Sequence, residues 1–570
     1  MLTLGINGID KIFHDASATV VKDGKVVASV EEERFNRKKH SDGLPLNSIE
    51  FCMRKAGASF DDLDHIGYYL DPTVLKKVFV DDVVEKFGCT PRKLRYYAEA
   101  ADRISKVEKT LRKKYRIGER TKFHYMNHHL AHAAGAYFLS GFDESAILTL
   151  DGSGDRETCA IFRGKGSEIS KVEDVLVYPE SLGFIYTTIA AHLGLGWIEG
   201  PGKLMGLAGY GKANPRLFEG VVRLKEDASK PVEVDLSFFD YYIGGTGLSE
   251  KGKQRFGPSR DPKERLQQAH FELAASTQAM LEAAISHIVR FIPELVPGTE
   301  NVCFAGGVAL NVRANRLIID SGLFKGFFVP PPANDAGTSL GCALDLSAQY
   351  SGNQRYQFDV YCGPDIGEDY SIPEALEKVK KKVVWKKLSE DDLCEKAAEL
   401  IGVNLIIGWA RGRMECGPRA LGNRSILTNA MNPQAKEELN AKVKHREWFR
   451  PYAPSVLAEE ASKWFDLRVP SPYMLLEAKV LDGKESIIPG VTHVDKTARV
   501  QTVSQEQNPT YYRLISAFGR RTGVPLVLNT SFNRHGEPIV NTPEEAIRAL
   551  LETRMDALFL GEYYVSKAGA

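Results

Sequence analysis

The chain of 570 residues lacks the features that mark several broad protein classes. Its 74 Lys and Arg residues balance 74 Asp and Glu residues, which argues against a general nucleic-acid binder. Its eight cysteines include no C-x-x-C pair, so we expect reduced, mostly buried thiols and neither a disulfide framework nor a zinc ribbon. No uncharged apolar run approaches the ~20 residues that span a bilayer, and the N-terminal residues lack the pattern of a signal peptide. These absences predict a cytoplasmic protein with no membrane partner.

The common phosphate-binding signatures G-x-x-x-x-G-K-[ST] and G-x-G-x-x-G are also missing. Three other glycine-rich segments are present: Asp151–Gly154, Gly306–Gly307, and Pro201–Gly211, which contains Lys203. Backbone N–H groups in such turns can bind an anion, although a tight turn in an α/β sheet explains each of them equally well when taken alone.

Hydrophobic patterns place strands, glycine turns and helices in both halves of the first ~350 residues, which predicts two α/β lobes. Asp23-Gly24 between two β-branched runs predicts a hairpin. Gly352-Asn353-Gln354 is the best linker candidate, and a separate α/β domain is expected beyond it. Expected strands are 2–7, 16–22, 25–32, 145–150, 159–162, 405–409, 453–457, 474–480 and 525–529; expected helices are 46–56, 73–87, 91–115 and 263–291, with no helix over 244–257.

Two histidines suggest a metal site. His128 and His132 stand at i and i+4, so a helix would place both imidazoles on one face. Asp151 at a strand end and Asp335 in a proline-rich loop offer oxygen ligands, and such mixed ligation suits iron, manganese or zinc more than calcium or magnesium. His129 and His124 remain alternative ligands, and packed or solvated histidines remain the alternative explanation.

Polar residues in the loops complete the candidate sites. His14, between the first strand and the hairpin, suits a general base, or else a structural histidine held by Asp15. Arg419 and Arg424 flank an expected helix start, and basic residues follow over 442–450. Arginine forks bind phosphate or carboxylate bidentately, so an anion pocket is favoured over solvated surface arginines or a nucleic-acid surface.

Taken together, these segments resemble the NodU/CmcH O-carbamoyltransferases, a family that includes the tobramycin carbamoyltransferase. The matching segments keep the family's order along nearly the whole chain. They are His14–Ala18, Glu31–His40, His128–Ala134, Asp151-Gly152, Gly202–Ala208, Ala305–Asn311, Gly417–Gly422, Arg446–Pro451 and Leu528–Asn533.

The resemblance implies a two-lobed, actin-like ATPase domain similar to TsaD over 1–350, a linker over 351–365, and a YrdC-like α/β domain over 366–570. It implies that the second domain converts carbamoyl phosphate and ATP into carbamoyl-adenylate. The first domain would then transfer the carbamoyl group to a hydroxyl of a small molecule, such as a natural product.

The resemblance also assigns roles to residues. His128, His132, Asp151 and Asp335 would bind Fe²⁺ or another divalent metal, with Mg²⁺ also compatible. His14 would deprotonate the acceptor and Lys39 would polarise the carbamoyl group. The nucleotide site of the first domain would include Asp151, Gly152, Lys203, Gly306, Gly307 and Asn311, and that of the second Arg419, Arg424, Lys444, Arg450, Arg499, Asn529 and Ser531.

Two rival functions remain open: a tRNA threonylcarbamoyladenosine-type modification enzyme, and a non-catalytic nucleotide-binding regulator. Neutral charge and the presence of both domains in one chain favour a small acceptor, so nucleic acid is not expected as a partner. A homodimer is compatible with the sequence. We expect acceptor specificity to reside around Tyr69–Tyr115 and Phe238–Gly257.

Overall fold

The computed structural model describes residues 1–9, 14–353 and 355–569, and its chain divides into two compact units. The first unit contains Met1–Glu32 and His40–Phe358, and the second contains Glu33–Lys39 and the chain from Asp359 onward. The division after Phe358 lies inside the segment 351–365; Gln354 of the expected linker lies outside the described residues. No sequence pattern indicated that Glu33–Lys39 would group with the second unit.

The first sheet of the first unit has the strand order β3-β2-β1-β4-β5. Its strands are β1 (Leu2–Asn7), β2 (Ser17–Lys22), β3 (Lys25–Glu31), β4 (His65–Tyr68) and β5 (Lys122–Tyr125). β1 pairs antiparallel with β2 and parallel with β4. The expected hairpin is confirmed, because Asp23 (φ 49°) and Gly24 (φ 78°) both adopt the left-handed conformation that a two-residue hairpin turn requires.

The second sheet repeats this topology in the order β12-β11-β6-β7-β8. Its strands are β6 (Glu144–Leu150), β7 (Glu157–Lys165), β8 (Glu168–Val177), β11 (Asn301–Ala305) and β12 (Gly326–Phe328). The central strand β6 again has an antiparallel neighbour, β7, on one side and a parallel neighbour, β11, on the other. The first unit therefore contains two α/β lobes of the same topology, as the recurring sequence pattern predicted.

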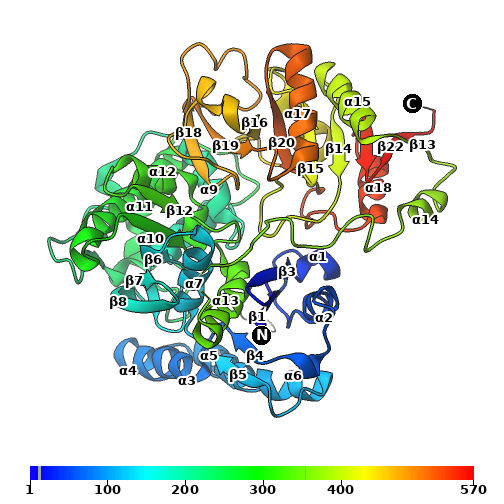
Figure 1. The fold of residues 1–570 in the computed structure, drawn as a ribbon. Coiled ribbons are helices and arrows are strands. Elements are labelled where there is room, and N and C mark those ends of the chain that lie inside the picture. The colour runs from blue at the N-terminus through cyan, green and yellow to red at the C-terminus, as the bar shows by residue number, and fades with distance from the viewer. Residues whose placement is uncertain (10–13, 354, 570) are drawn as a thin grey trace. The chain divides into compact units, whose positions relative to one another are not determined.

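Two helices connect these sheets, α7 (His128–Ser140) and α13 (Thr338–Ser351), which lie side by side in Figure 1. α7 packs on β6 and β11, and α13 packs on β1, β2 and α7. Their close approach requires glycine at position 341, because a Cβ there would lie 1.7 Å from the carbonyl oxygen of Ala131. The helix that carries His128 and His132 is therefore fixed between the two lobes.

The helices of the first unit follow the sequence pattern with some differences. The expected helix 73–87 is α3 (Pro72–Leu75), a π-helical turn (Lys76–Asp82) and α4 (Val83–Phe87), and the expected helix 91–115 is divided into α5 (Pro91–Ser105) and α6 (Val107–Tyr115). The expectation of no helix over 244–257 is wrong, because α10 (Glu250–Phe256) begins where the Ser249 hydroxyl accepts from the Gly252 N–H. The remaining elements are α2 (Leu46–Lys55), α8 (Leu182–His192), α9 (Gly200–Ala208), β9 (Val222–Leu224), β10 (Val232–Val234), α11 (Gln268–Leu295) and α12 (Val312–Asp320).

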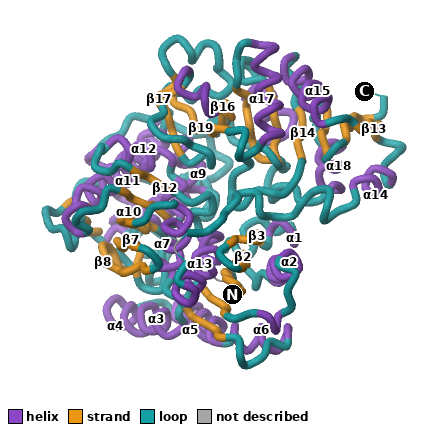
Figure 2. The backbone as a smooth tube through the Cα atoms, in the orientation of Figure 1, coloured by secondary structure: helices purple, strands orange, loops and turns teal. Residues whose placement is uncertain are grey.

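The second unit is built on one mixed sheet of ten strands, drawn in orange in Figure 2. Alternate residues of its central strands enter different cores: Val527 packs in the core with α15 and α17, whereas Leu526 and Leu528 pack in the core with α18. The strands are β13 (Val383–Lys387), β14 (Ile407–Ala410), β15 (Arg424–Thr428), β16 (Ala453–Leu457), β17 (Phe465–Asp466), β18 (Leu476–Val480), β19 (Thr497–Val503), β20 (Leu526–Ser531), β21 (Ala557–Leu560) and β22 (Tyr563–Lys567). The helices are α1 (Glu33–Asn36), α14 (Ile372–Glu377), α15 (Glu390–Gly402), α16 (Ala435–Leu439), α17 (Pro509–Thr522) and α18 (Pro543–Glu552).

All eight cysteines are free thiols, and seven of them are buried, as their scattered spacing predicted. Among the described residues, no helix combines the length and the apolar character needed to cross a bilayer.

Candidate functional site

His128, His132, Asp151 and Asp335 converge in the first unit, with one ligand atom from each inside a cluster 4.8 Å across. The Nε2 atoms of His128 and His132 are 3.1 Å apart. His132 Nε2 lies 3.2 Å from an oxygen of Asp151 and 3.6 Å from an oxygen of Asp335. The structure therefore brings all four predicted ligands together.

Each ligand is held by the local fold. α7 begins at Asn127, whose side chain accepts from the Leu130 N–H, and the Asp155 carboxylate accepts from the His128 N–H at 2.7 Å. Sequence reasoning missed Asp155, because its role depends on a contact between the β6–β7 loop and the first residue of α7. These contacts place both histidines in the first two turns of α7.

Asp151 directly follows β6, where it meets the two glycine turns. Its carboxylate accepts from the backbone N–H groups of Gly152 (2.5 Å) and Gly307 (2.6 Å). Gly306 has φ 95°, and a Cβ there would lie 2.3 Å from the carbonyl oxygen of Leu150. Only glycine fits this turn, and the turn directs the Gly307 N–H towards Asp151.

The electrostatics of the cluster favour a positive charge among its side chains. Burial and the neighbouring His132 lower the pKa of His128 to about 3. Burial also opposes protonation of His132, but hydrogen bonds and charge from Asp151 and Asp335 outweigh it and raise its pKa to about 9. The pKa of Asp151 is lowered despite burial, mainly by His132. A proton on His132 thus offsets part of the charge of the two carboxylates.

These residues fit a divalent metal. Two buried imidazoles and two carboxylates form a mixed nitrogen and oxygen donor set, which suits iron, manganese or zinc. The alternative ligands lie elsewhere: His129 Nδ1 pairs with the Thr149 hydroxyl at 2.7 Å, and His124 Nε2 pairs with His65 Nδ1 at 3.1 Å.

His14 lies beside this cluster, and its side chain is 42% exposed. Partial loss of solvent around the ring tends to lower its pKa, but the charge and hydrogen bond of Asp15, together with the charges of Asp335 and Asp151, raise it to about 10. His14 is therefore protonated at neutral pH beside these three carboxylates.

The other predicted residues of the first unit have mixed surroundings. Lys203, on α9, lies 3.7 Å from Glu199. The Asn311 side chain caps α12 and bonds Gln278. Lys39, predicted to act with His14, groups with the second unit, where its charge adds to burial and neighbouring arginines in lowering the pKa of Lys444.

In the second unit, a cation cluster forms from Arg419, Lys444, Arg446, Arg450 and Arg499. Burial and the charge of Arg450 lower the pKa of Arg419 to about 10, and burial together with Arg419, Arg446 and Arg450 lowers that of Arg499 well below its usual range. The Nε atoms of Arg419, Arg446 and Arg499 are buried and have no hydrogen-bond partner among the described residues. Such a cluster is ready to receive an anion.

Arg424 is placed differently from the other predicted arginines. It opens β15, so the expected helix start between Arg419 and Arg424 is wrong. Its guanidinium donates to the carbonyl oxygens of Arg411, Gly412 and Pro364, and its charged neighbours are acidic, Glu415 first among them. In this structure Arg424 therefore joins the loops that precede β15.

Asn529 and Ser531 end β20 close to this cation cluster. Asn529 donates to the carbonyl oxygen of Ala420 at 3.1 Å, and the Lys444 ammonium donates to the backbone carbonyl oxygen of Ser531 at 2.5 Å. Arg446 also belongs to the cluster but was not predicted as a site residue. Its position between Lys444 and Arg450 in the sequence was the available signal.

Two segments in which we expected acceptor specificity meet beside the aspartate turn. Phe79 stacks on Tyr178 at 4.2 Å, and the Tyr241 hydroxyl donates to the carbonyl oxygen of Pro179. Tyr241 contacts Phe184 at 5.2 Å between ring centres, and Phe184 lies against Gly152. An aromatic wall thus connects both segments to the candidate site.

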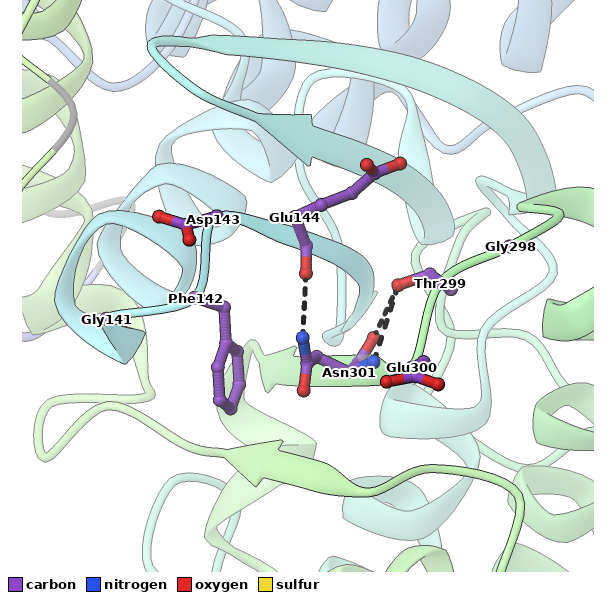
Figure 3. Close-up of a pocket in the computed structure, with 8 residues that line it drawn as sticks. All are labelled: Gly141, Phe142, Asp143, Glu144, Gly298, Thr299, Glu300 and Asn301. Atoms are coloured by element: carbon purple, nitrogen blue, oxygen red, sulfur yellow. Dashed lines mark hydrogen bonds between the residues drawn. The ribbon is translucent and has the colours of Figure 1, made fainter.

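A separate pocket, shown in Figure 3, lies at the amino ends of β6 and β11, opposite Asp151 and Gly306. Its Asn301 side chain donates to the carbonyl oxygen of Glu144 at 3.0 Å. Its acids are paired with cations: Asp143 with Arg355, Glu144 with Arg163, and Glu300 with Lys325. None of the predicted site residues lines this pocket.

Comparison with protein families and curated proteins gives a consistent result. A family model described as the carbamoyltransferase N-terminus matches residues 5–344, and one described as the carbamoyltransferase C-terminus matches residues 398–567. The nodulation protein NolNO of Sinorhizobium fredii is 38% identical over 100% of this chain and 83% of its own length. Protein sll1178 of Synechocystis is 37% identical, covering 99% of this chain and 96% of that protein. The 3'-hydroxymethylcephem-O-carbamoyltransferase of Streptomyces clavuligerus is 26% identical over 94% of each chain.

Proposed function

This chain belongs to the carbamoyltransferase family, and we propose on that premise that it is an ATP-dependent O-carbamoyltransferase acting on a hydroxyl of a small molecule. In the proposed first half-reaction, carbamoyl phosphate and water give phosphate and carbamate. A carbamate oxygen then attacks the α-phosphorus of ATP, which forms carbamoyl-adenylate and releases pyrophosphate. In the second, the acceptor hydroxyl attacks the carbamoyl carbon and AMP leaves.

The observation that carries this proposal is the cation cluster of the second unit. Arg419, Arg446 and Arg499 are half-buried, and the Nε atom of each is buried without a hydrogen-bond partner among the described residues. Loss of solvent around each guanidinium and the charge of Arg450 contribute to lowering the pKa of all three. Burying several like charges is costly unless a ligand compensates them. The phosphates of ATP and carbamoyl phosphate supply that compensation, so we assign the first half-reaction to this cluster.

The second half-reaction is assigned to the first unit. His128, His132, Asp151 and Asp335 would hold iron or another divalent ion, which supplies a positive charge for the phosphate of the adenylate. The Gly152 and Gly307 turns, with Lys203 and Asn311, would border the nucleotide.

His14 is proposed as the base that takes the proton of the acceptor hydroxyl. It needs to be neutral for this role, whereas Asp15, Asp335 and Asp151 hold its pKa near 10. A cation bound by Asp335 and Asp151 compensates their negative charges. Two of the three influences that raise the pKa of His14 are then removed, and its pKa falls. Lys39 is proposed to polarise the carbamoyl group.

The fold assignment extends the same proposal. Two sheets of identical strand order, with α7 and α13 between them, support an actin-like, TsaD-like first domain. We also assign a YrdC-like character to the mixed ten-stranded sheet of the second unit, and the acceptor class of a natural product to the whole protein.

Pyrophosphate exchange tests the first half-reaction without knowledge of the acceptor. Purified protein with iron or manganese should incorporate labelled pyrophosphate into ATP only when carbamoyl phosphate is present. Exchange without carbamoyl phosphate, or none with it, would contradict the proposal. Any multiple-turnover release of AMP would also exclude a non-catalytic regulator, and binding of tRNA would favour the modification enzyme.

A further inference from the structure

The carboxylate of Asp15 holds two histidines at once. Its Oδ2 atom lies 3.1 Å from His14 Nδ1, and its Oδ1 atom lies 2.7 Å from His40 Nδ1. Oδ2 also accepts from the side-chain amide of Asn334 at 2.7 Å. Three side chains from three loops therefore meet on one carboxylate whose own side chain is only 11% exposed.

The backbone at Asp15 is fixed in an unusual conformation. Its φ is 63°, in the left-handed region that residues other than glycine seldom adopt. The carbonyl oxygen of Asp15 accepts from Asn7, and the next N–H, that of Ala16, donates to Ser41. Strain of this kind persists where the surrounding structure determines it, and here it aims the carboxylate at His14.

The same contacts tie His14 to a predicted metal ligand. Asn334, which donates to Asp15, directly precedes Asp335. Asn7 donates both to the carbonyl oxygen of Asp15 and to that of Asp335, at 3.0 and 2.6 Å. Asp15 thus sits in one bonded network with the loop that presents Asp335.

We propose that Asp15 is the positioning residue for His14 in the carbamoyl-transfer step, an inference that rests on the proposed function. By accepting from Nδ1, Asp15 leaves His14 Nε2 as the atom that takes the acceptor proton. Asp15, itself held by Asn334, fixes the plane of the His14 ring. The negative charge of Asp15 stabilises the imidazolium that forms. An imidazole held at one nitrogen by a carboxylate has a defined tautomer, which a base requires.

The two carboxylate oxygens make the prediction for variants asymmetric. The amide that Asp15→Asn introduces has one oxygen and one NH₂ group. The Oδ2 position faces two donors, His14 and Asn334, whereas the Oδ1 position faces one, His40. We therefore expect this variant to turn its oxygen towards His14 and Asn334, and its NH₂ towards His40. Asp15→Gly removes both acceptors while fitting the left-handed backbone without strain.

Proton NMR of protein labelled with ¹⁵N-histidine reads this arrangement without requiring activity. The wild type should show two low-field Nδ1–H resonances, assigned by their loss in His14→Gln and His40→Gln. Asp15→Asn should keep the His14 resonance and lose that of His40, and Asp15→Gly should lose both. A His14 resonance that survives in Asp15→Gly would overturn the inference. So would the loss of both resonances when Zn²⁺ alone is added to the wild type, because His14, Asp15 and His40 would then form a metal site.

Kinetics supply the second measurement, with glycerol as the hydroxyl probe and AMP release as the signal. Asp15→Gly should slow AMP release by at least about 100-fold, because orientation and charge are both lost. Asp15→Asn should slow it by about 10-fold, since a neutral hydrogen bond replaces a charged one. Asp345→Asn, a matched change at another buried carboxylate of the same unit, should leave it unaltered.

Pyrophosphate exchange should remain at the wild-type rate in all three variants. If the wild type itself shows no exchange, the proposed function fails while the bonds of Asp15 are still judged by NMR. If exchange is normal and Asp15→Gly releases AMP at the wild-type rate, the inference fails and the proposed function stands.

Discussion

The guanidinium of Arg419 is expected to bind an anion and, when no anion is bound, to lower the free energy of unfolding of the second unit. Burial and the charge of Arg450 lower its pKa from 12.5 to about 10. This lowering corresponds to about 3 kcal/mol by which folding disfavours the charged side chain. Arg419→Met removes the charge and retains an apolar stem, so it should raise the free energy of unfolding by up to about 3 kcal/mol.

Hydrogen exchange of the buried strands β15 and β20 measures this change within the second unit. A gain of about 3 kcal/mol would slow their slowest amides by about 100-fold. Arg554→Met, at an exposed arginine of the same unit, is the matched control and should change exchange little. Carbamoyl phosphate should slow exchange in the wild type and not in Arg419→Met. Faster hydrogen exchange in Arg419→Met than in the wild type would refute the view that Arg419 binds an anion at a cost in stability.

Three further predictions concern the first unit. Glu157 accepts from Asn127 and Lys171, and with other contacts these outweigh burial and lower its pKa from 4.5 to about 2. Its carboxylate therefore contributes about 3 kcal/mol to the free energy of unfolding, which is present above pH 4.5 and is lost as the pH falls towards 2. Glu157→Gln should flatten an acid-unfolding curve over that range. Gly341→Ala should abolish the close packing of α7 on α13 and lower the melting temperature, whereas Gly202→Ala, in open space, should change it less. Binding of Mn²⁺ should release between one and two protons at pH 7.5. His132, with a pKa of about 9, has to lose its proton, and the bound cation also lowers the pKa of His14. Calorimetry in two buffers checks this, and proton-neutral binding would contradict it.

Much of the first unit could be predicted because its signals are local. Strand Leu2–Asn7 has the bounds that its apolar run indicated, and the i,i+4 spacing placed His128 and His132 on one face of α7. Asp151 and Gly306 follow apolar strands, so their position at strand ends was readable as well. Asp335 was proposed from its place in a proline-rich loop, and the family resemblance added it to the ligand set, although its neighbours in space are far away in the chain.

The remainder depended on tertiary contacts that spacing does not reveal. Asp15 was visible only as a neighbour of His14, since its bonds to His40 and Asn334 require the folded loops. Arg424 was expected in the anion pocket, but both of its terminal nitrogens donate to backbone carbonyl oxygens. The helix at 250–256 was missed because glycines around it masked a capped turn, and Lys39 could not be placed with the second unit from its position before His40.

In the proposed function, activation of the carbamoyl group and its transfer use different residues in different units. Carbamoyl-phosphate-dependent pyrophosphate exchange in Arg499→Met and His14→Gln tests it most directly. We expect Arg499→Met to lose pyrophosphate exchange, because the cation cluster no longer binds phosphate, and His14→Gln to exchange at the wild-type rate. Loss of exchange in both variants, or retention in Arg499→Met, would contradict it.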